Sequence, residues 1–284
     1  MHPHPRRDAG MTRMVFIGGG NMASAIIGGL IAEGASPAEF RVVEPLPAQR
    51  ERLVARFPGI ALHEACTATA IAGVDVVVLA VKPQQMRGAA QALAPLIAPV
   101  SWVLTIAAGV RCTDLSRWLG GYARIVRAMP NTPALVGAGI SGVYAMPGAR
   151  DHAAAAAAIL GACGEVLWLD DEQHLDAVTG VSGSGPAYVF YFLEALERAA
   201  RELGFTDADA RRLAYATFAG SIRLAMASED SPTTLRANVT SKGGTTARAI
   251  EAMDAAKVAG HFVDAVKAAA ERARELGEEF GRDA

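Results

Sequence analysis

The chain has little of several features that would mark a particular class of protein. Only 6% of its 284 residues are aromatic, and its three cysteines, Cys66, Cys112 and Cys163, form no CxxC pair. An odd number of widely spaced cysteines argues against a disulfide framework and favours a reducing cytoplasm. The six histidines form no HxxxH pair, so we expect no metal site.

Long apolar runs and an excess of charge of one sign are also missing. No run of about 18 uncharged apolar residues occurs, so we expect no transmembrane helix and no membrane partner. The formal net charge is −2, which carries no electrostatic signal for nucleic-acid binding. The opening MHPHPRRDAG lacks the apolar stretch of a signal peptide. We expect residues 1–12 to be a disordered leader.

Apolar runs typical of strands alternate with helical patterns in the first half of the chain, over residues 13–170. Such alternation predicts an α/β domain with a parallel sheet flanked by helices. The expected strands are Arg13–Ile17, Phe40–Glu44, Asp75–Ala80, Trp102–Ile106 and Arg124–Ala128, with weaker candidates at Gly139–Ala145 and Glu165–Leu169. The expected helices are Asn21–Glu33, Leu46–Phe57, Gln84–Ile97, Thr113–Leu119 and an alanine-rich surface helix with Asp151 as its N-cap.

The strand pattern stops near Asp170, and residues 171–284 are predicted to form a helical domain. The expected helices are Pro186–Leu203, Asp207–Ala227, Pro232–Val239, Thr246–Met253 and Ala256–Glu279. The segment AYVFYFLEALERAARELG is apolar around most of its early turns, so this helix must be buried on several sides. A small helical domain cannot cover it alone, and we expect an obligate homodimer or a larger assembly.

A glycine-rich turn follows the first expected strand in the segment MVFIGGGNMASAIIGGL. It matches the dinucleotide-binding pattern G-x-G-x-x-A. Gly18 would allow the tight turn, Gly20 the approach of a pyrophosphate, and Ala23 close packing of helix on strand. Asn21 and Met22 complete the predicted cofactor-binding set at this turn. The alternative is a glycine-rich turn that binds nothing.

An acidic residue, Glu44, ends the second expected strand in FRVVEP. A carboxylate at this position can bind the adenosine ribose hydroxyls and would repel a 2′-phosphate. Glu44 therefore favours NADH over NADPH. The alternative is a solvent-exposed strand end, and Arg41, Arg50 and Arg52 lie near enough in sequence to soften the preference.

Further candidate cofactor contacts follow later strands, in LAVKPQ, TIAAGV and AMPNTPA. In open parallel sheets, ligands lie beyond the carboxyl ends of the strands. The predicted contacts are Ala80, Val81, Lys82, Pro83, Ala107, Ala108, Gly109, Pro130, Asn131 and Thr132. For Asn131 and Thr132 an ordinary turn is an equal alternative.

The segment VTSKGGTTARAIEAM places hydroxyls, a lysine and two glycines before a helix start. Helix N-termini offer unpaired N–H groups that attract anions, and glycines let the backbone curl around them. The pattern predicts a site for a small anion. The alternative is an interhelical turn in which a threonine is simply the N-cap.

Taken together, these segments resemble the pyrroline-5-carboxylate reductase family. The matching stretches are FIGGGNMASAIIGGL, AVKPQ, IAAGV, RAMPNTPALVGAG, VTGVSGSGPAYVF and NVTSKGGTTARAIEAM. The resemblance implies hydride transfer from NADPH or NADH to the C=N carbon of L-1-pyrroline-5-carboxylate, giving L-proline in the last step of proline biosynthesis. It also implies an N-terminal Rossmann domain and a helical C-terminal dimerisation domain, in assemblies that include decamers built from dimers.

The resemblance further implies that the substrate lies between the nicotinamide and the helical domain. The substrate-binding residues that it implies are Ser241, Gly243, Gly244, Thr245, Thr246, Glu229 and Asn238. We assign Thr246 as the catalytic residue, through a hydroxyl that hydrogen-bonds the ring nitrogen. Members of the family often use NADPH, whereas Glu44 favours NADH.

Two other functions are compatible with a dinucleotide-binding pattern. A β-hydroxyacid dehydrogenase would need a lysine acid on the first long helix of the second domain, and Ser184–Leu203 contains no lysine. The lysines of the chain are Lys82, Lys242, Lys257 and Lys267. A non-catalytic NAD-binding regulator would share the motif but would turn over no substrate.

Overall fold

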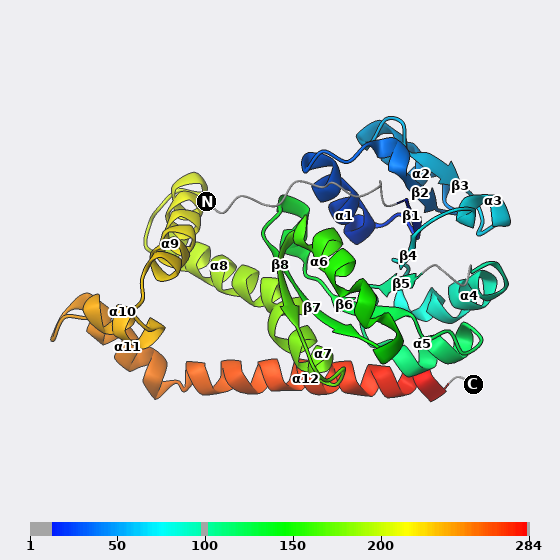
Figure 1. Ribbon diagram of the computed structural model, residues 1–284. Coiled ribbons are helices and arrows are strands. Elements are labelled where there is room, and N and C mark those ends of the chain that lie inside the picture. The colour runs from blue at the N-terminus through cyan, green and yellow to red at the C-terminus, as the bar shows by residue number, and fades with distance from the viewer. Residues whose placement is uncertain (1–12, 98–101, 283–284) are drawn as a thin grey trace. The chain divides into compact units, whose positions relative to one another are not determined.

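The structure is a computed structural model that describes residues 13–97 and 102–282 (Figure 1). The predicted leader, residues 1–12, lies outside the described residues. The chain forms two compact units, of which the second is Ser184–Ala268. The first unit comprises the chain up to Gly183 together with the segment from Ala269 onward.

An eight-stranded sheet of order β3-β2-β1-β4-β5-β6-β7-β8 forms the centre of the first unit. The neighbouring strands are parallel except for the antiparallel pair β6–β7. The order β3-β2-β1-β4-β5-β6 is that of the doubly wound dinucleotide-binding fold, so the predicted fold class is confirmed. The strands are β1 (Met14–Ile17), β2 (Phe40–Val43), β3 (Ala61–His63), β4 (Val76–Leu79), β5 (Trp102–Thr105), β6 (Ile125–Met129), β7 (Gly139–Ala145) and β8 (Gly164–Trp168).

Helices flank this sheet. Three of the four helices predicted here with both bounds begin and end within one residue of them, whereas the predicted helix Gln84–Ile97 ends four residues earlier, at Leu93. The helices are α1 (Asn21–Ala32), α2 (Pro47–Arg56), α3 (Ala68–Ile71), α4 (Pro83–Leu93), α5 (Cys112–Trp118), α6 (Ala153–Gly161) and α7 (His174–Val178). Shorter 3₁₀ turns are η1 (Pro37–Glu39), η2 (Ala94–Leu96), η3 (Thr132–Val136) and η4 (Pro147–His152), and η5 (Thr179–Gly183) is a π-helix. The predicted N-cap Asp151 is wrong, because that residue belongs to η4 and His152 precedes α6.

Residues along each central strand alternate between two cores, one on each face of the sheet. On β1, Met14 and Phe16 join the core under α1 and α6, whereas Val15 and Ile17 join the core under α4 and α5. Side chains of a strand point alternately to opposite faces, so a strand covered on both faces must be apolar at every position. This is why β1, β4 and β5 appear in the sequence as unbroken apolar runs.

The second unit is entirely helical and has little core of its own. Its helices are α8 (Gly185–Glu202), α9 (Asp207–Ala227), α10 (Pro232–Asn238), α11 (Thr245–Ala255) and the first part of α12 (Val258–Arg282). Its buried apolar residues are alanines, namely Ala200, Ala210 and Ala214. Large apolar side chains such as Phe190, Ile222 and Met226 are exposed. Such uncovered apolar surface is typical of an interaction interface.

The two units divide after Gly183, later than the boundary expected near residue 170. The reason is that α7 and η5, which have no clear sequence signal, pack against the sheet. The segment of α12 beyond Ala269 also belongs to the first unit: a Cβ on Gly180 would lie 2.8 Å from the backbone nitrogen of Ala270.

Candidate active site

The glycine turn between β1 and α1 has the geometry that a dinucleotide requires. Gly18 has a φ of +98°, and a Cβ there would lie 2.8 Å from the Ala80 carbonyl oxygen, so only glycine fits. Gly20 is the N-cap of α1, and a Cβ on it would meet nothing within 4 Å. The turn is thus closed toward β4 and open on the side of Gly20.

The N-terminus of α1 faces that open side without a side-chain cap. The N–H groups of its first residues, Asn21, Met22 and Ala23, have no partner within the helix, and Ala23 itself is buried in the core. A helix N-terminus with free N–H groups binds phosphate through hydrogen bonds and the helix dipole. The residues present here therefore fit the pyrophosphate of a dinucleotide.

Glu44 follows β2 and is only 7% exposed, so the alternative of a solvent-exposed strand end is wrong. Its Oε2 accepts a hydrogen bond from the Gly19 N–H at 3.0 Å, and its Oε1 accepts one from the Leu46 N–H at 3.0 Å. The Gln49 amide donates to the Gly19 carbonyl at 2.6 Å. The carboxylate is therefore held against the glycine turn, next to the N–H groups at the start of α1.

Two of the nearby arginines are bonded to other parts of the protein. The Arg41 Nη1 donates to carbonyl oxygens at the end of α3, the shortest bond being 2.7 Å to Ala72. The Arg50 Nη1 donates to the carbonyls of Glu44 and Pro45, and its Nη2 pairs with Glu64. Arg52 is exposed on α2.

The other predicted cofactor loops follow β4, β5 and β6, which lie side by side and parallel to β1. Parallel strands place their carboxyl ends at one edge of a sheet, so the structure brings these loops and the glycine turn to the same edge. Ala80 and Val81 follow β4, Lys82 is the N-cap of α4, and Pro83 is its first residue. Ala107, Ala108 and Gly109 follow β5, and Pro130, Asn131 and Thr132 follow β6.

Two residues of this edge have structural contacts that constrain them. Gly109 has a φ of +70°, and a Cβ there would lie 3.3 Å from both Leu276 and Phe280 of α12. The buried Asn131 accepts a hydrogen bond from the Ile140 N–H at 3.0 Å and donates to the Ser182 carbonyl at 3.1 Å. Its amide therefore ties the end of β6 to β7 and to η5.

A buried ion-pair cluster beneath this edge was missed in the sequence. Arg127 on β6 is 3% exposed and pairs with Glu172 at 2.8 Å and with Asp176 at 3.7 Å. Glu172 also accepts the Cys112 N–H at 2.7 Å. Burial raises the pKa of the Asp176 carboxyl, and Arg127 opposes that rise. The sequence feature that could have revealed this cluster is an arginine inside an apolar strand, because a buried arginine requires a partner.

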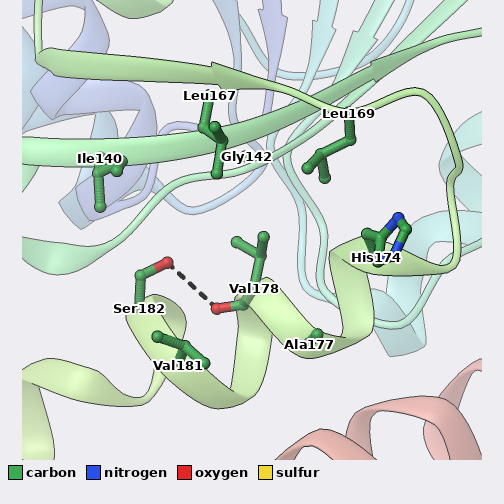
Figure 2. Close-up of a pocket in the computed structure, with 9 residues that line it drawn as sticks. All are labelled: Ile140, Gly142, Leu167, Leu169, His174, Ala177, Val178, Val181 and Ser182. Atoms are coloured by element: carbon green, nitrogen blue, oxygen red, sulfur yellow. Dashed lines mark hydrogen bonds between the residues drawn. The ribbon is translucent and has the colours of Figure 1, made fainter.

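An apolar pocket of about 450 Å³ lies between the β7–β8 pair and the α7–η5 segment (Figure 2). Its lining residues are Ile140, Gly142, Leu167, Leu169, His174, Ala177, Val178, Val181 and Ser182. None of them is a predicted site residue. The wall is almost wholly apolar, so this pocket does not suit a carboxylate.

The predicted anion-binding loop lies in the second unit, before α11. Gly243 has a φ of +73°, and the Gly244 N–H donates to the Ser241 carbonyl at 3.0 Å. Gly244 is the N-cap of α11 and carries no side chain. The alternative in which a threonine caps the helix is therefore wrong.

The first N–H groups of α11, from Thr245 and Thr246, have no helical or side-chain partner. Ser241 and Thr245 are exposed, and Thr246 is half-buried. Glu229 lies between α9 and α10, and Asn238 is the last residue of α10; both are exposed. The loop thus combines hydroxyls with N–H groups that have no partner within the helix.

The part of the chain that the structure describes has neither a metal-binding cluster nor a membrane-spanning helix. Residues 13–97 and 102–282 contain no group of three or more His, Cys, Asp or Glu that could hold a metal ion. Within the same residues, no helix is long and apolar enough to cross a membrane.

Comparison with known proteins gives matches over both units. Residues 172–276 match the family model "Pyrroline-5-carboxylate reductase dimerisation", and residues 13–109 match "NADP oxidoreductase coenzyme F420-dependent". The chain is 45% identical to the pyrroline-5-carboxylate reductase of Pseudomonas aeruginosa, covering 95% of this chain and 98% of the relative.

Solved structures agree. The pyrroline-5-carboxylate reductase of Coxiella burnetii aligns with a TM-score of 0.86 and 38% identity over 94% of this chain and 99% of that one. The Plasmodium falciparum enzyme, solved with NADP bound, aligns with a TM-score of 0.84 and 25% identity over 94% and 100%. Because the identity is 45% and the match covers nearly the whole of both chains, this chain belongs to the pyrroline-5-carboxylate reductase family.

Proposed function

We propose that the protein is an NAD(P)H-dependent oxidoreductase that reduces the C=N bond of L-1-pyrroline-5-carboxylate to give L-proline. The observation that carries the proposal is the 45% identity to a pyrroline-5-carboxylate reductase over 95% of the chain, because it includes both units at once. The glycine turn and the α11 loop supply the two binding functions that this reaction needs.

The first unit would bind the dinucleotide. In this proposal the glycine turn and the start of α1, from Gly18 to Ala23, hold the pyrophosphate, and Glu44 holds the adenosine ribose. The loops after β4, β5 and β6 hold the nicotinamide half. The bound reduced nicotinamide supplies the hydride. We propose NADH as the preferred cofactor because Glu44 would repel a 2′-phosphate.

The second unit would bind the substrate. Its carboxylate would accept hydrogen bonds from the N–H groups of Thr245 and Thr246 and from the Ser241 hydroxyl. The left-handed Gly243 and the N-cap Gly244 make room for the anion in the bend. Glu229 and Asn238 are proposed as further substrate contacts.

Thr246 is the proposed catalytic residue, with its hydroxyl bonded to the ring nitrogen of the substrate. A protonated imine is already electrophilic, so positioning its carbon against the hydride donor supplies most of the rate. No strong general acid is then needed. This fits a loop that offers the hydroxyls of Ser241, Thr245 and Thr246 beside a single lysine, Lys242.

The dimerisation segment indicates self-association of the chain. Its exposed apolar residues, such as Phe190 and Met226, would be covered in the dimer. We propose that dimers assemble further, with a decamer as the largest expected form, and that the enzyme acts in the cytoplasm. Light scattering of the purified protein would measure the mass of the assembly.

The reaction can be tested by following the loss of reduced-nicotinamide absorbance. We expect turnover with the pyrroline substrate, faster with NADH than with NADPH, and none with an α-keto or a β-keto acid. Turnover of the β-keto acid alone would favour a β-hydroxyacid dehydrogenase, although α8 contains no lysine acid. Cofactor binding with no turnover of either substrate would favour a regulator.

Thr246→Ala tests the proposed catalytic hydroxyl. We expect kcat to fall roughly tenfold, the size of one lost hydrogen bond in the transition state, with cofactor affinity unchanged. Thr245→Ala is the matched control, because Thr245 would act through its backbone N–H and should keep near-normal kinetics. Unchanged kcat in Thr246→Ala would refute the assignment.

A further inference from the structure

The strands β2 and β3 lie side by side (Figure 1), and each is followed by an acid, Glu44 after β2 and Glu64 after β3. The strands are neighbours here, since the Glu44 N–H donates to the His63 carbonyl at 2.9 Å. Arg50 on α2 lies between the two acids that follow these strands: its Nη1 donates to the Glu44 carbonyl at 2.9 Å, and its Nη2 pairs with the Glu64 carboxylate at 2.6 Å.

From this arrangement we infer that Glu64 is a specificity-determining residue for the cofactor. By pairing with Arg50, it withholds the nearby guanidinium from a 2′-phosphate and so strengthens discrimination against NADPH. The inference rests on the proposed function, in that the dinucleotide must bind with its adenosine ribose at Glu44.

The position of Arg50 supports this role. Its Nη1 bonds to the carbonyls of both Glu44 and Pro45, at 2.9 Å each, which holds the guanidinium beside the residue proposed to bind the ribose. A guanidinium is the side chain best suited to a phosphate, because it combines a fixed charge with several directed N–H donors. With Nη1 held by these two carbonyls, the Nη2 group that now pairs with Glu64 is the one that would turn to another anion.

The formal charge of this group of residues supports the same inference. Glu44, Arg50 and Glu64 together carry a formal charge of −1 when all are ionised, which disfavours an additional phosphate. Without the charge of Glu64 the sum is zero, and an N–H edge of Arg50 becomes available. The Glu64 side chain is 79% exposed, whereas that of Arg50 is 18% exposed, so Glu64 can be changed without disturbing the core.

Glu64→Gln keeps the size of the side chain and removes its charge. We expect the affinity for NADPH to rise about tenfold, which is the size of one new charge-assisted hydrogen bond, while the affinity for NADH changes less than about twofold. The Kd of each cofactor is to be measured by calorimetry, with 2′-phospho-AMP against AMP as the minimal pair. The kcat/KM ratio of the two cofactors should change in parallel.

Glu51→Gln is the matched control, because Glu51 is an exposed glutamate that directly follows Arg50 on α2. It removes the same charge without removing the partner of Arg50, and we expect no change in the cofactor ratio. In the double variant Glu64→Gln/Arg50→Gln the gain for NADPH should disappear.

Two results would overturn the inference: an unchanged NADPH/NADH ratio in Glu64→Gln, or an equal rise in Glu51→Gln, which would indicate a general charge effect. Failure of the proposed function is distinguishable from both. In that case the pyrroline substrate is not reduced, yet the calorimetric shift in Glu64→Gln still appears.

Discussion

Replacing Arg127 by methionine tests whether the buried ion-pair cluster stabilises the sheet near the edge where the predicted cofactor loops lie. Arg127 is 3% exposed on β6, two residues before Met129 ends the strand. Its partners Glu172 and Asp176 come from the segment around α7, and Glu172 also binds the N–H of Cys112 at the start of α5. The substitution would leave two carboxylates facing an apolar side chain.

Removing one partner of a buried ion pair typically costs about 3–5 kcal/mol. Here each carboxylate is 19% exposed, and water can solvate both in part. We therefore expect a loss of about 2–3 kcal/mol in the free energy of unfolding. For a domain of this size that corresponds to a decrease of roughly 5–10 °C in Tm.

The loss should also depend on pH. Burial raises the pKa of Asp176 and Arg127 opposes the rise, so Arg127→Met should raise it further. An acid whose pKa is higher in the folded state stabilises the fold increasingly as pH falls through that pKa. The deficit of Arg127→Met relative to the natural protein should therefore shrink as the pH is lowered from about 7 to about 5.

The measurement is urea unfolding at a fixed protein concentration, because self-association contributes to the measured stability. Arg248→Met is the control: Arg248 is exposed and pairs with Glu251 at 3.4 Å, and its loss should cost less than about 0.5 kcal/mol. A loss below about 1 kcal/mol for Arg127→Met, or a deficit that grows at low pH, would refute the reasoning.

Two further predictions concern packing and titration. Gly180→Ala should lower the free energy of unfolding by about 1–3 kcal/mol in urea titration, because the new Cβ would lie 2.8 Å from the Ala270 backbone nitrogen; an unchanged midpoint would mean that α12 has room to shift. Burial and then Arg124 lower the pKa of His152, whose ring stacks on Trp102 at 5.3 Å. Folding stability should therefore fall as pH drops below about 6.5 and through the lowered pKa. His152→Phe keeps the stack and should flatten that slope in thermal unfolding; parallel slopes would contradict the assignment.

Much of the fold follows from local sequence. The unbroken apolar runs of β1, β4 and β5 predict strands covered on both faces, and the glycine turn at Gly18 predicts the crossing to α1. Both features depend on neighbours within a few residues, so they can be predicted from the sequence without knowledge of the tertiary structure. The loop at Gly243 and Gly244 was predictable for the same reason, since its backbone angles and its helix start are local.

Other features of the structure could not be predicted from the sequence. β3 has only three residues, and α7 is one short turn followed by a π-helix, so neither shows a clear period. Asn131 was predicted as a cofactor contact, but its bonds to Ile140 and Ser182 depend on how β7 and η5 pack.

The sequence by itself determined the alternation of strands and helices, the glycine turn and the carboxylate after β2, because each is a property of a short segment. Tertiary structure alone decided which charges meet. Arg127 pairs with Glu172, 45 residues away, and Arg50 on α2 pairs with Glu64 at the end of β3, 14 residues away. An ion pair forms between groups within a few ångströms, and only the packing of the sheet sets that distance.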